Sequence, residues 1–315
     1  MTLNRPGRRS RRGGAVSAAA APTRPIVRWY GGKWKLAHKI IARFPKHRCY
    51  VEPFGGGGSV LMRKPRSHAE VWNDLDGEIV NVFRVLRDDA LAARLIAQLE
   101  LTPFARDELT AAYDLCDEPV ERARRLIVLS YMGFGSNAHA RVPTGFRNNS
   151  TRSGTTPAMD WRNYPDCVPA MIERLRGVIV ENRDACEVMA QMDGPETLHY
   201  VDPPYVHATR AHGNPYDAQY RGYAHEMDDA AHVKLLDFLD RLEGSVVLSG
   251  YPHPLYDERL RAWHRDEIPA HADGARDRTE VLWLNPHCWD RLGAERRRAL
   301  TERQDDLPLE VAEAV

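Results

Sequence analysis

Short apolar runs that end in an acidic residue recur along the chain, and a loop containing glycine or proline follows each of them. RCYVEP, AEVWND and TLHYVDPPY show this pattern most clearly. Amphipathic stretches with a helical period lie between such runs. Because strands that alternate with helices pair in parallel, the pattern predicts an α/β fold with a largely parallel sheet.

Further runs extend this sheet and bound an insertion. VIVEN, SVVLSGY and EVLWLNP are predicted strands, and DDAAHVKLLDFLDRL is a predicted helix. Residues 88–132 are predicted to be helical, with Asp88 as a cap and Thr102-Pro103 as the end of the first helix. Residues 133–165 follow no period and are rich in Gly, Asn, Ser, Thr and Arg. The sequence therefore predicts a sheet domain formed by residues 26–87 and 176–290, interrupted by a mostly helical insert at 88–175.

The charge is placed unevenly in a chain of zero net charge. No acid precedes Glu52, whereas thirteen Lys or Arg do, and the last fifteen residues carry five acids and one Arg. A basic front end favours a polyanionic partner, although a solvated tail would look the same. We expect a disordered arm at residues 1–25, which lacks the Leu-rich core of a secretory signal, and a tail at residues 291–315.

Cysteine usage and hydropathy exclude several classes of protein. The five cysteines form no CxxC pair, which argues against a zinc site or a disulfide framework and favours a reducing compartment, the cytoplasm. No apolar run approaches membrane-spanning length. His207, His212 and His225 lie in one polar segment, 206–229, but without the spacing of metal ligands. We expect neither a membrane span nor a metal, and a mobile flap in that segment.

The tetrapeptide DPPY at 202–205 follows the predicted strand TLHYV directly. Open α/β sheets bind ligands at the carboxyl ends of their strands. The Asp202 carboxylate and the Pro203 carbonyl can accept both hydrogens of a planar amine, which favours a pyramidal, nucleophilic nitrogen. Tandem prolines stiffen the loop and remove two amide donors. Tyr205 adds a face on which a base can stack. A solvent-exposed turn is the alternative interpretation.

Two further motifs indicate a nucleoside-like ligand. EPFGGGGS at 52–59 is a glycine-rich turn after a strand, and it lacks the lysine of a phosphate-binding loop. Asp74 ends the next strand, where an acid can bind a ribose. Capping of the following helix is an equal alternative for Asp74. Near the N-terminus, WYGGK at 29–33 could border the same ligand or simply place a buried Trp beside a turn.

In this order the motifs resemble the Dam-like, alpha-ordered D12 class of adenine-specific DNA N6-methyltransferases, over roughly residues 26–287. LSGY at 248–251 and EVLWLN at 280–285 resemble that family's later strands, although Gly250 replaces its usual Asn. The resemblance implies a Rossmann-like S-adenosylmethionine-dependent methyltransferase sheet with an inserted target-recognition domain. It also implies methyl transfer from S-adenosylmethionine to N6 of a flipped-out adenine in double-stranded DNA.

Carried over to this sequence, the family's motifs imply two sets of site residues. The catalytic group is Asp202, Pro203 and Tyr205. The cofactor-binding group is Trp29, Lys33, Glu52, Phe54, Gly55, Gly57, Asp74, Asp184 and Asp202. The family's aromatic residue after the acid at 184 is replaced here by Ala185.

Residues 88–175 are the expected target-recognition region. Arginine reads guanine edges and asparagine reads adenine edges, while other arginines contact phosphates. The candidates share the polar stretch with Phe146, Trp161 and Tyr164, and they are Arg141, Arg147, Asn148, Asn149 and Arg152. Any single one of them could instead be a solubilising loop residue. The resemblance further implies a bacterial or phage-encoded protein that acts on double-stranded DNA, and we expect a monomer.

Other functions are compatible with the same motifs. An RNA or protein amide methyltransferase, a cytosine-N4 methyltransferase and a non-catalytic DNA-binding relic of the fold are the alternatives. The Arg- and Asn-rich insert favours DNA, and Asp at position 202 favours adenine. Cytosine-C5 methylation would need a Pro-Cys nucleophile, and the sequence has no such dipeptide.

Overall fold

A seven-stranded mixed sheet forms the centre of the protein, in the order β3-β2-β1-β4-β5-β7-β6. The computed structural model describes residues 21–135, 143–149, 154–206, 225–271 and 277–305. Strands β3, β2, β1, β4 and β5 pair in parallel, and β7 runs antiparallel to both β5 and β6. The strands are β1 Cys49–Glu52, β2 Ala69–Asn73, β3 Val178–Glu181, β4 Thr197–Val201, β5 Ser245–Gly250, β6 His264–His271 and β7 Asp277–Leu284. The predicted α/β fold is confirmed.

Alternate side chains of the central strands belong to two separate cores. On β1, Tyr50 packs with one buried cluster and Val51 with the other, and Trp72 and Val71 on β2 divide in the same way. Neighbouring residues of a strand point to opposite faces, so a sheet buried on both faces needs apolar residues at every position. Burial of both faces of the sheet therefore explains the continuous apolar runs in the sequence.

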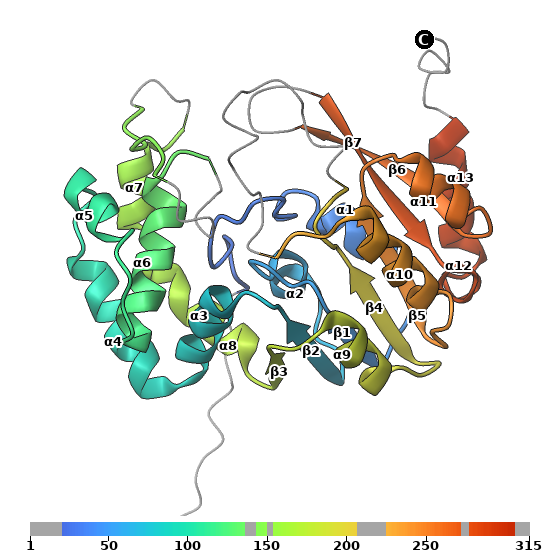
Figure 1. Ribbon diagram of the computed structural model, residues 1–315, viewed down its shortest axis with the longest axis horizontal. Coiled ribbons are helices and arrows are strands. Elements are labelled where there is room, and N and C mark those ends of the chain that lie inside the picture. Colours follow the sequence, from blue (N-terminus) through green and yellow to red (C-terminus); the bar gives the residue numbers. More distant parts are fainter. Residues whose placement is uncertain (1–20, 136–142, 150–153, 207–224, 272–276, 306–315) are drawn as a thin grey trace, which may run out of the picture.

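Helices cover both faces of the sheet (Figure 1). The core that contains Val51 includes residues of α9 (Ala185–Met192), α10 (Asp229–Leu239) and α11 (Pro254–Arg259). The core that contains Tyr50 includes residues of α1 (Ala37–Ile41), α2 (Ser59–Arg63) and α12 (Pro286–Arg291). These helices lie against a sheet whose strands end at a common edge, and that edge carries the candidate site.

A group of helices stands beside β3, between β2 and β3 in the chain (Figure 1). Asp88 accepts hydrogen bonds from Ala90 and Leu91 at the start of α4, and Thr102 follows its end, as predicted. Helix α6 packs against both α3 and α4. The group comprises α3 Gly77–Arg87, α4 Asp89–Leu101, α5 Arg106–Ala111, α6 Pro119–Met132, α7 Pro157–Arg162, the 3₁₀ helix η2 Pro165–Cys167 and α8 Val168–Leu175.

Four features differ from the sequence-based expectations. Strand β6 was not predicted. The interval 291–315, expected to be a tail, contains α13 (Ala294–Asp305), which contacts β6. Trp161 and Tyr164 are buried rather than available to DNA, and they donate hydrogen bonds to the Thr102 and Ile26 carbonyls. Within the expected arm, Arg24 donates a 2.7 Å hydrogen bond to the Asp160 carbonyl.

Some expectations fall on parts of the chain that the structure does not describe. They are the arm at residues 1–20, the flap with His207 and His212, and the candidate DNA contacts Arg141 and Arg152. Among the described residues, no helix is long and apolar enough to cross a membrane.

Candidate active site

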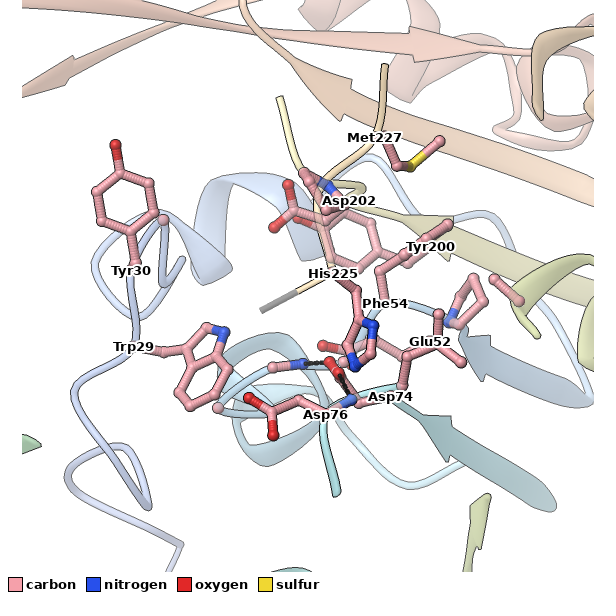
Figure 2. A pocket seen from close by; sticks show the side chains of 18 of the residues that line it. Trp29, Tyr30, Glu52, Phe54, Asp74, Asp76, Tyr200, Asp202, His225 and Met227 are labelled. Atoms are coloured by element: carbon pink, nitrogen blue, oxygen red, sulfur yellow. Dashed lines mark hydrogen bonds between the residues drawn. The ribbon is translucent and has the colours of Figure 1, made fainter. Parts of the chain in front are cut away.

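A cavity of about 360 Å³ opens at the carboxyl ends of β1, β2 and β4. Strand order reverses between β1 and β4, because the chain continues outward from β1 to β2 and β3 before returning to β4. Open α/β sheets bind their ligands at such a reversal. In the view of Figure 2, Asp202 lies at the upper side of the pocket and Asp74 at the lower side. Both line the cavity together with Trp29, Glu52 and Phe54.

The glycine-rich turn after β1 lies tightly against the buried Trp72 and the partly buried Trp29. The Gly55 amide donates a 2.8 Å hydrogen bond to the Asn73 carbonyl. A Cβ atom on Gly55 would lie 2.0 Å from Nε1 of Trp72, and one on Gly56 would lie 2.6 Å from Nε1 of Trp29. Gly56 also has a φ of 46°, which favours glycine. Glycines here therefore let the backbone itself form the cavity wall.

Asp74 joins this turn to the start of α3. Its Oδ2 accepts a 2.7 Å hydrogen bond from the Gly56 amide, and its Oδ1 accepts a 2.8 Å bond from the Asp76 amide. The cap of α3 is Asp76, which accepts from Glu78, so Asp74 does not serve as the cap that the sequence allowed. Burial raises the pKa of Asp74 to about 6. Each oxygen keeps a lone pair that can accept from a ligand hydroxyl.

Glu52 is a buried carboxylate at the end of β1. Its Oε2 accepts from the Tyr50 hydroxyl at 2.8 Å and from the Leu61 amide at 3.0 Å. Burial raises the pKa of Glu52 to about 8, and the nearby Asp202 carboxylate adds to this shift. The carboxyl group of Glu52, which is protonated near neutral pH and would be ionised by a nearby cation, thus forms part of the cavity wall.

Asp202 forms a buried ion pair with Lys33. Lys33 Nζ lies 2.9 Å and 3.0 Å from the two carboxylate oxygens and donates a further 2.8 Å bond to the Gly31 carbonyl. Burial alone would lower the pKa of Lys33, but the Asp202 and Glu280 carboxylates raise it. Burial raises the pKa of Asp202 above its ordinary value, and the ammonium opposes this. Lys33 was predicted to contact a cofactor, and here it also reaches the predicted catalytic acid.

Tyr205 lies behind the cavity, 7% exposed. Its hydroxyl donates to Glu280, its ring contacts the Tyr251 ring edge to face at 4.5 Å, and Lys33 Nζ lies 4.8 Å from the ring centroid. Of the DPPY residues, Asp202 and Pro204 line the cavity and Pro203 and Tyr205 do not. Glu280 was not singled out in the sequence, although its strand was. A charged residue within an otherwise apolar strand was the available signal.

The remaining predicted cofactor residues also gather at this cavity. Trp29, Phe54, Gly55, Gly57 and Asp184 all line it. Asp184 caps α9 by accepting from the Cys186 and Glu187 amides. The structure therefore brings together all the predicted cofactor-binding residues, from five separate segments of the chain.

The predicted DNA-binding residues that the structure describes lie apart, beyond α6. Arg147 is half-buried and donates to the Tyr131 carbonyl at 3.2 Å, while Asn148 and Asn149 are exposed. The backbone of this segment pairs with the chain after α6 through an antiparallel bridge between Gly133 and Phe146. Next to this bridge the side chain of Phe134 is 72% exposed. Phe134 was not among the residues predicted from the sequence.

No group of three His, Cys, Asp or Glu that could hold a metal ion occurs within the described ranges. The chemistry of the cavity is instead that of carboxylates, aromatic rings and glycine backbone. Such a lining suits a ligand that carries positive charge, a ribose and a planar base.

Comparison with known proteins agrees with this geometry. Residues 29–266 match the family of D12 class N6 adenine-specific DNA methyltransferases. A type II methyltransferase, M1.LlaDCHI of Lactococcus lactis subsp. cremoris, is 25% identical over 83% of this chain and 95% of its own length. The DNA adenine methylase of Salmonella typhi is 27% identical over 58% of this chain and 65% of its own length. Type II methyltransferase M.MjaIII of Methanocaldococcus jannaschii is 22% identical over 72% and 83% of the two chains.

The match to the family covers most of the chain, including the glycine-rich turn, Asp74 and the DPPY segment. The fold, the position of the cavity at the strand reversal and the relatives lead to the same conclusion. The chain belongs to the D12 class of N6 adenine-specific DNA methyltransferases.

Proposed function

We propose that this methyltransferase binds S-adenosylmethionine in the cavity and methylates N6 of an adenine flipped out of double-stranded DNA. The observation that carries the proposal is the position of Asp202. It directly follows β4 at the strand reversal and lines the same cavity as Asp74, which directly follows β2. One carboxylate can therefore face a target amine while the other binds a ribose at the far side of the same space.

The cavity fits this cofactor in size and in charge. A volume of about 360 Å³ lies in the range of small-molecule sites. Glu52, Asp74, Asp76 and Asp202 line it, and the Lys33 ammonium is already paired with Asp202. A sulfonium and an ammonium group would thus lie among several carboxyl groups, while Trp29 and Phe54 offer faces to a purine. The absence of any phosphate in the ligand matches this acidic lining.

Methyl transfer then depends on how nucleophilic the nitrogen of the target amine is. S-adenosylmethionine supplies an electrophilic methyl group when bound. The lone pair of an adenine N6 is delocalised into the ring, so the protein must hold both of its N–H bonds to localise that pair. Asp202 accepts one N–H and the Pro203 carbonyl accepts the other, since prolines at 203 and 204 leave the loop rigid. The Tyr205 ring supports the extrahelical base, at roughly 1–3 kcal/mol.

Target recognition is assigned to residues 88–175, with the catalytic domain formed by 26–87 and 176–290. Exposed Asn148 and Asn149, with Arg147 beside them, supply base-edge and phosphate contacts. Phe134 adds an exposed aromatic ring that can contact an unstacked base step. We further infer a modification role beside a restriction enzyme, because the relatives include proteins named type II methyltransferase and modification methylase.

The test is transfer of a labelled methyl group to a DNA duplex, followed by nucleoside analysis. The expected product is N6-methyladenine, with no label in Asp202→Ala. A cofactor titration of the same variant separates lost chemistry from lost binding. Label in N4-methylcytosine, RNA or protein, or an active Asp202→Ala, would contradict the proposal. Binding of DNA and cofactor without any transfer by the native chain would indicate a non-catalytic relic.

A further inference from the structure

Glu280 is a second buried carboxylate next to the predicted catalytic acid. It lies on β7, is 3% exposed, and is not one of the residues that line the cavity. Its Oε1 accepts hydrogen bonds from the Tyr205 hydroxyl and, at 2.5 Å, from Ser249 Oγ. The same oxygen lies 3.8 Å from Lys33 Nζ. Glu280 thus contacts residues from three segments that are far apart in the sequence.

Among the described residues, Lys33 is the one cation in these contacts, and it serves both the buried Glu280 and the half-buried Asp202. Its ammonium binds both oxygens of Asp202 directly and lies within ion-pair distance of Glu280. Buried charges need partners, and each carboxylate in such a cluster competes for the shared ammonium. With Asp202 and Glu280 ionised, the group carries one net negative charge. The strength of the Lys33–Asp202 pair therefore depends on Glu280.

We propose that Glu280 is a positioning residue for methyl transfer. It shares the Lys33 ammonium with Asp202 and fixes the Tyr205 hydroxyl, so that Asp202 stays a strong acceptor for the target amine. The inference rests on the proposed function, because it assigns that acceptor role to Asp202. Lys33 already donates to both Asp202 oxygens. Without Glu280 it would pair with Asp202 alone, and its N–H groups would compete more strongly with the amine for those oxygens.

The neighbouring titratable groups determine how the cluster responds to pH. Burial raises the pKa of both Glu280 and Asp202, and Lys33 opposes the shift in each case. Burial also raises the pKa of Tyr205 well above its ordinary value, so its hydroxyl stays a donor near neutral pH. The other groups that act on this cluster are Tyr200 on β4, Tyr251 after β5, Tyr256 on α11 and Glu52 on β1.

The test variant is Glu280→Gln, which keeps the shape and the acceptor oxygen but removes the charge. Single-turnover methyl transfer is measured at saturating cofactor across the acid limb of the pH profile. Partners that orient a functional group typically contribute about 10–100-fold, and we expect a rate loss of that order. The acid limb should move to lower pH, because Lys33 then pairs with Asp202 alone and lowers its pKa. Cofactor affinity, measured by calorimetry, should stay within about threefold of the native value.

Two further variants should change the acid limb of the pH profile in directions that can be checked separately. Glu280→Asp keeps the charge and should restore the native acid limb in part. Tyr205→Phe removes a hydroxyl that lowers the pKa of Asp202, so the acid limb should move to higher pH. The opposite shifts of Glu280→Gln and Tyr205→Phe cannot come from general loosening of the site. Glu280→Asp keeps the inference testable if Glu280→Gln fails to fold.

The matched control is Asp266→Asn on the neighbouring strand β6. Asp266 is also a buried carboxylate paired with a buried cation, at 2.5 Å from Arg43 Nε. Its loss should lower the melting temperature and leave the rate and the acid limb unchanged. Native rate and acid limb in Glu280→Gln, or the same shift in Asp266→Asn, would overturn the inference. Label in N6-methyladenine from the native chain and its loss in Asp202→Ala test the proposed function separately.

Discussion

Replacing Gly55 by alanine perturbs the glycine-rich turn at one atom. The added Cβ would lie 2.0 Å from Nε1 and 2.4 Å from Cδ1 of Trp72. Trp72 cannot easily move, because it is fully buried and stacked on Phe83 with ring centroids 3.8 Å apart and planes 9° apart. The turn must therefore move away from β2, which breaks the Gly55 bond to Asn73 and the Gly56 bond to Asp74.

The loss of stability follows from the overlap with Trp72 and from the two broken hydrogen bonds. Overpacking a dense core costs about 1–3 kcal/mol, and each lost hydrogen bond costs about 0.5–1.5 kcal/mol. We therefore expect Gly55→Ala to lower the free energy of unfolding by about 2–6 kcal/mol. Because the shifted turn is also the cavity wall, affinity for S-adenosylmethionine should fall by at least about tenfold, which corresponds to 1.4 kcal/mol.

The matched control is Gly77→Ala at the first residue of α3. A Cβ at Gly77 would meet no atom within 4 Å, and alanine favours the helix. Chemical denaturation and calorimetric titration of both variants complete the assay. If Gly55→Ala matched Gly77→Ala in both stability and cofactor affinity, the argument that the turn needs glycine for close approach would be refuted.

Three more predictions concern the cofactor and the DNA. Asp74→Ala should weaken S-adenosylmethionine binding by roughly 1.5–3 kcal/mol in calorimetry, and unchanged affinity in a folded variant would remove Asp74 from the site. Because burial raises the pKa of Glu52 to about 8, it ionises as pH rises through that value. Relative to Glu52→Gln, native affinity for the cationic cofactor should rise about tenfold from pH 7 to 9, and parallel profiles would count against this. Phe134→Ala should weaken duplex binding by about 1–3 kcal/mol in fluorescence anisotropy, whereas Leu101→Ala, at a side chain that is still more exposed, should not.

The sheet could be predicted because its central strands carry a local signal. Buried parallel strands are mostly apolar on both faces, and their ends coincide with the acids at 52 and 202 and with the Asn73-Asp74 pair. Parallel strands end at one edge, so acids at those ends must lie near one another. The position of the cavity follows from these strand ends, whereas Trp29, Lys33, Phe54 and Asp184 were predicted to line it only from the resemblance to the family.

Strand β6 gave no such signal because it is an edge strand. Its sequence HRDEIPAH holds charged residues and Pro269, which suit an edge that must not pair further. Helix α13 is polar along almost its whole length, so its sequence does not differ from that of a solvated tail. Both elements are determined by their neighbours in space and not by their own period.

The pairing of Lys33 could not be predicted for a different reason. Its partners Asp202 and Glu280 follow it by 169 and 247 positions, and no spacing rule links them. The WYGGK motif places Lys33 beside a cofactor in the family, which is compatible with its lining the cavity. Its pairing with the predicted catalytic acid becomes visible only when β4 and β7 are in place.

The distribution of charge explains how a chain of zero net charge can hold both a cationic cofactor and a polyanion. Carboxylates end the strands and line the cavity, where burial raises the pKa values of Glu52 and Asp74. A cation entering that space favours their ionised forms, so binding and deprotonation are coupled. The candidate DNA contacts Asn148 and Asn149 are exposed and are not among the residues that line the cavity. Asp202 does line it, and the ammonium of Lys33 favours the ionised form of this carboxylate without the cofactor.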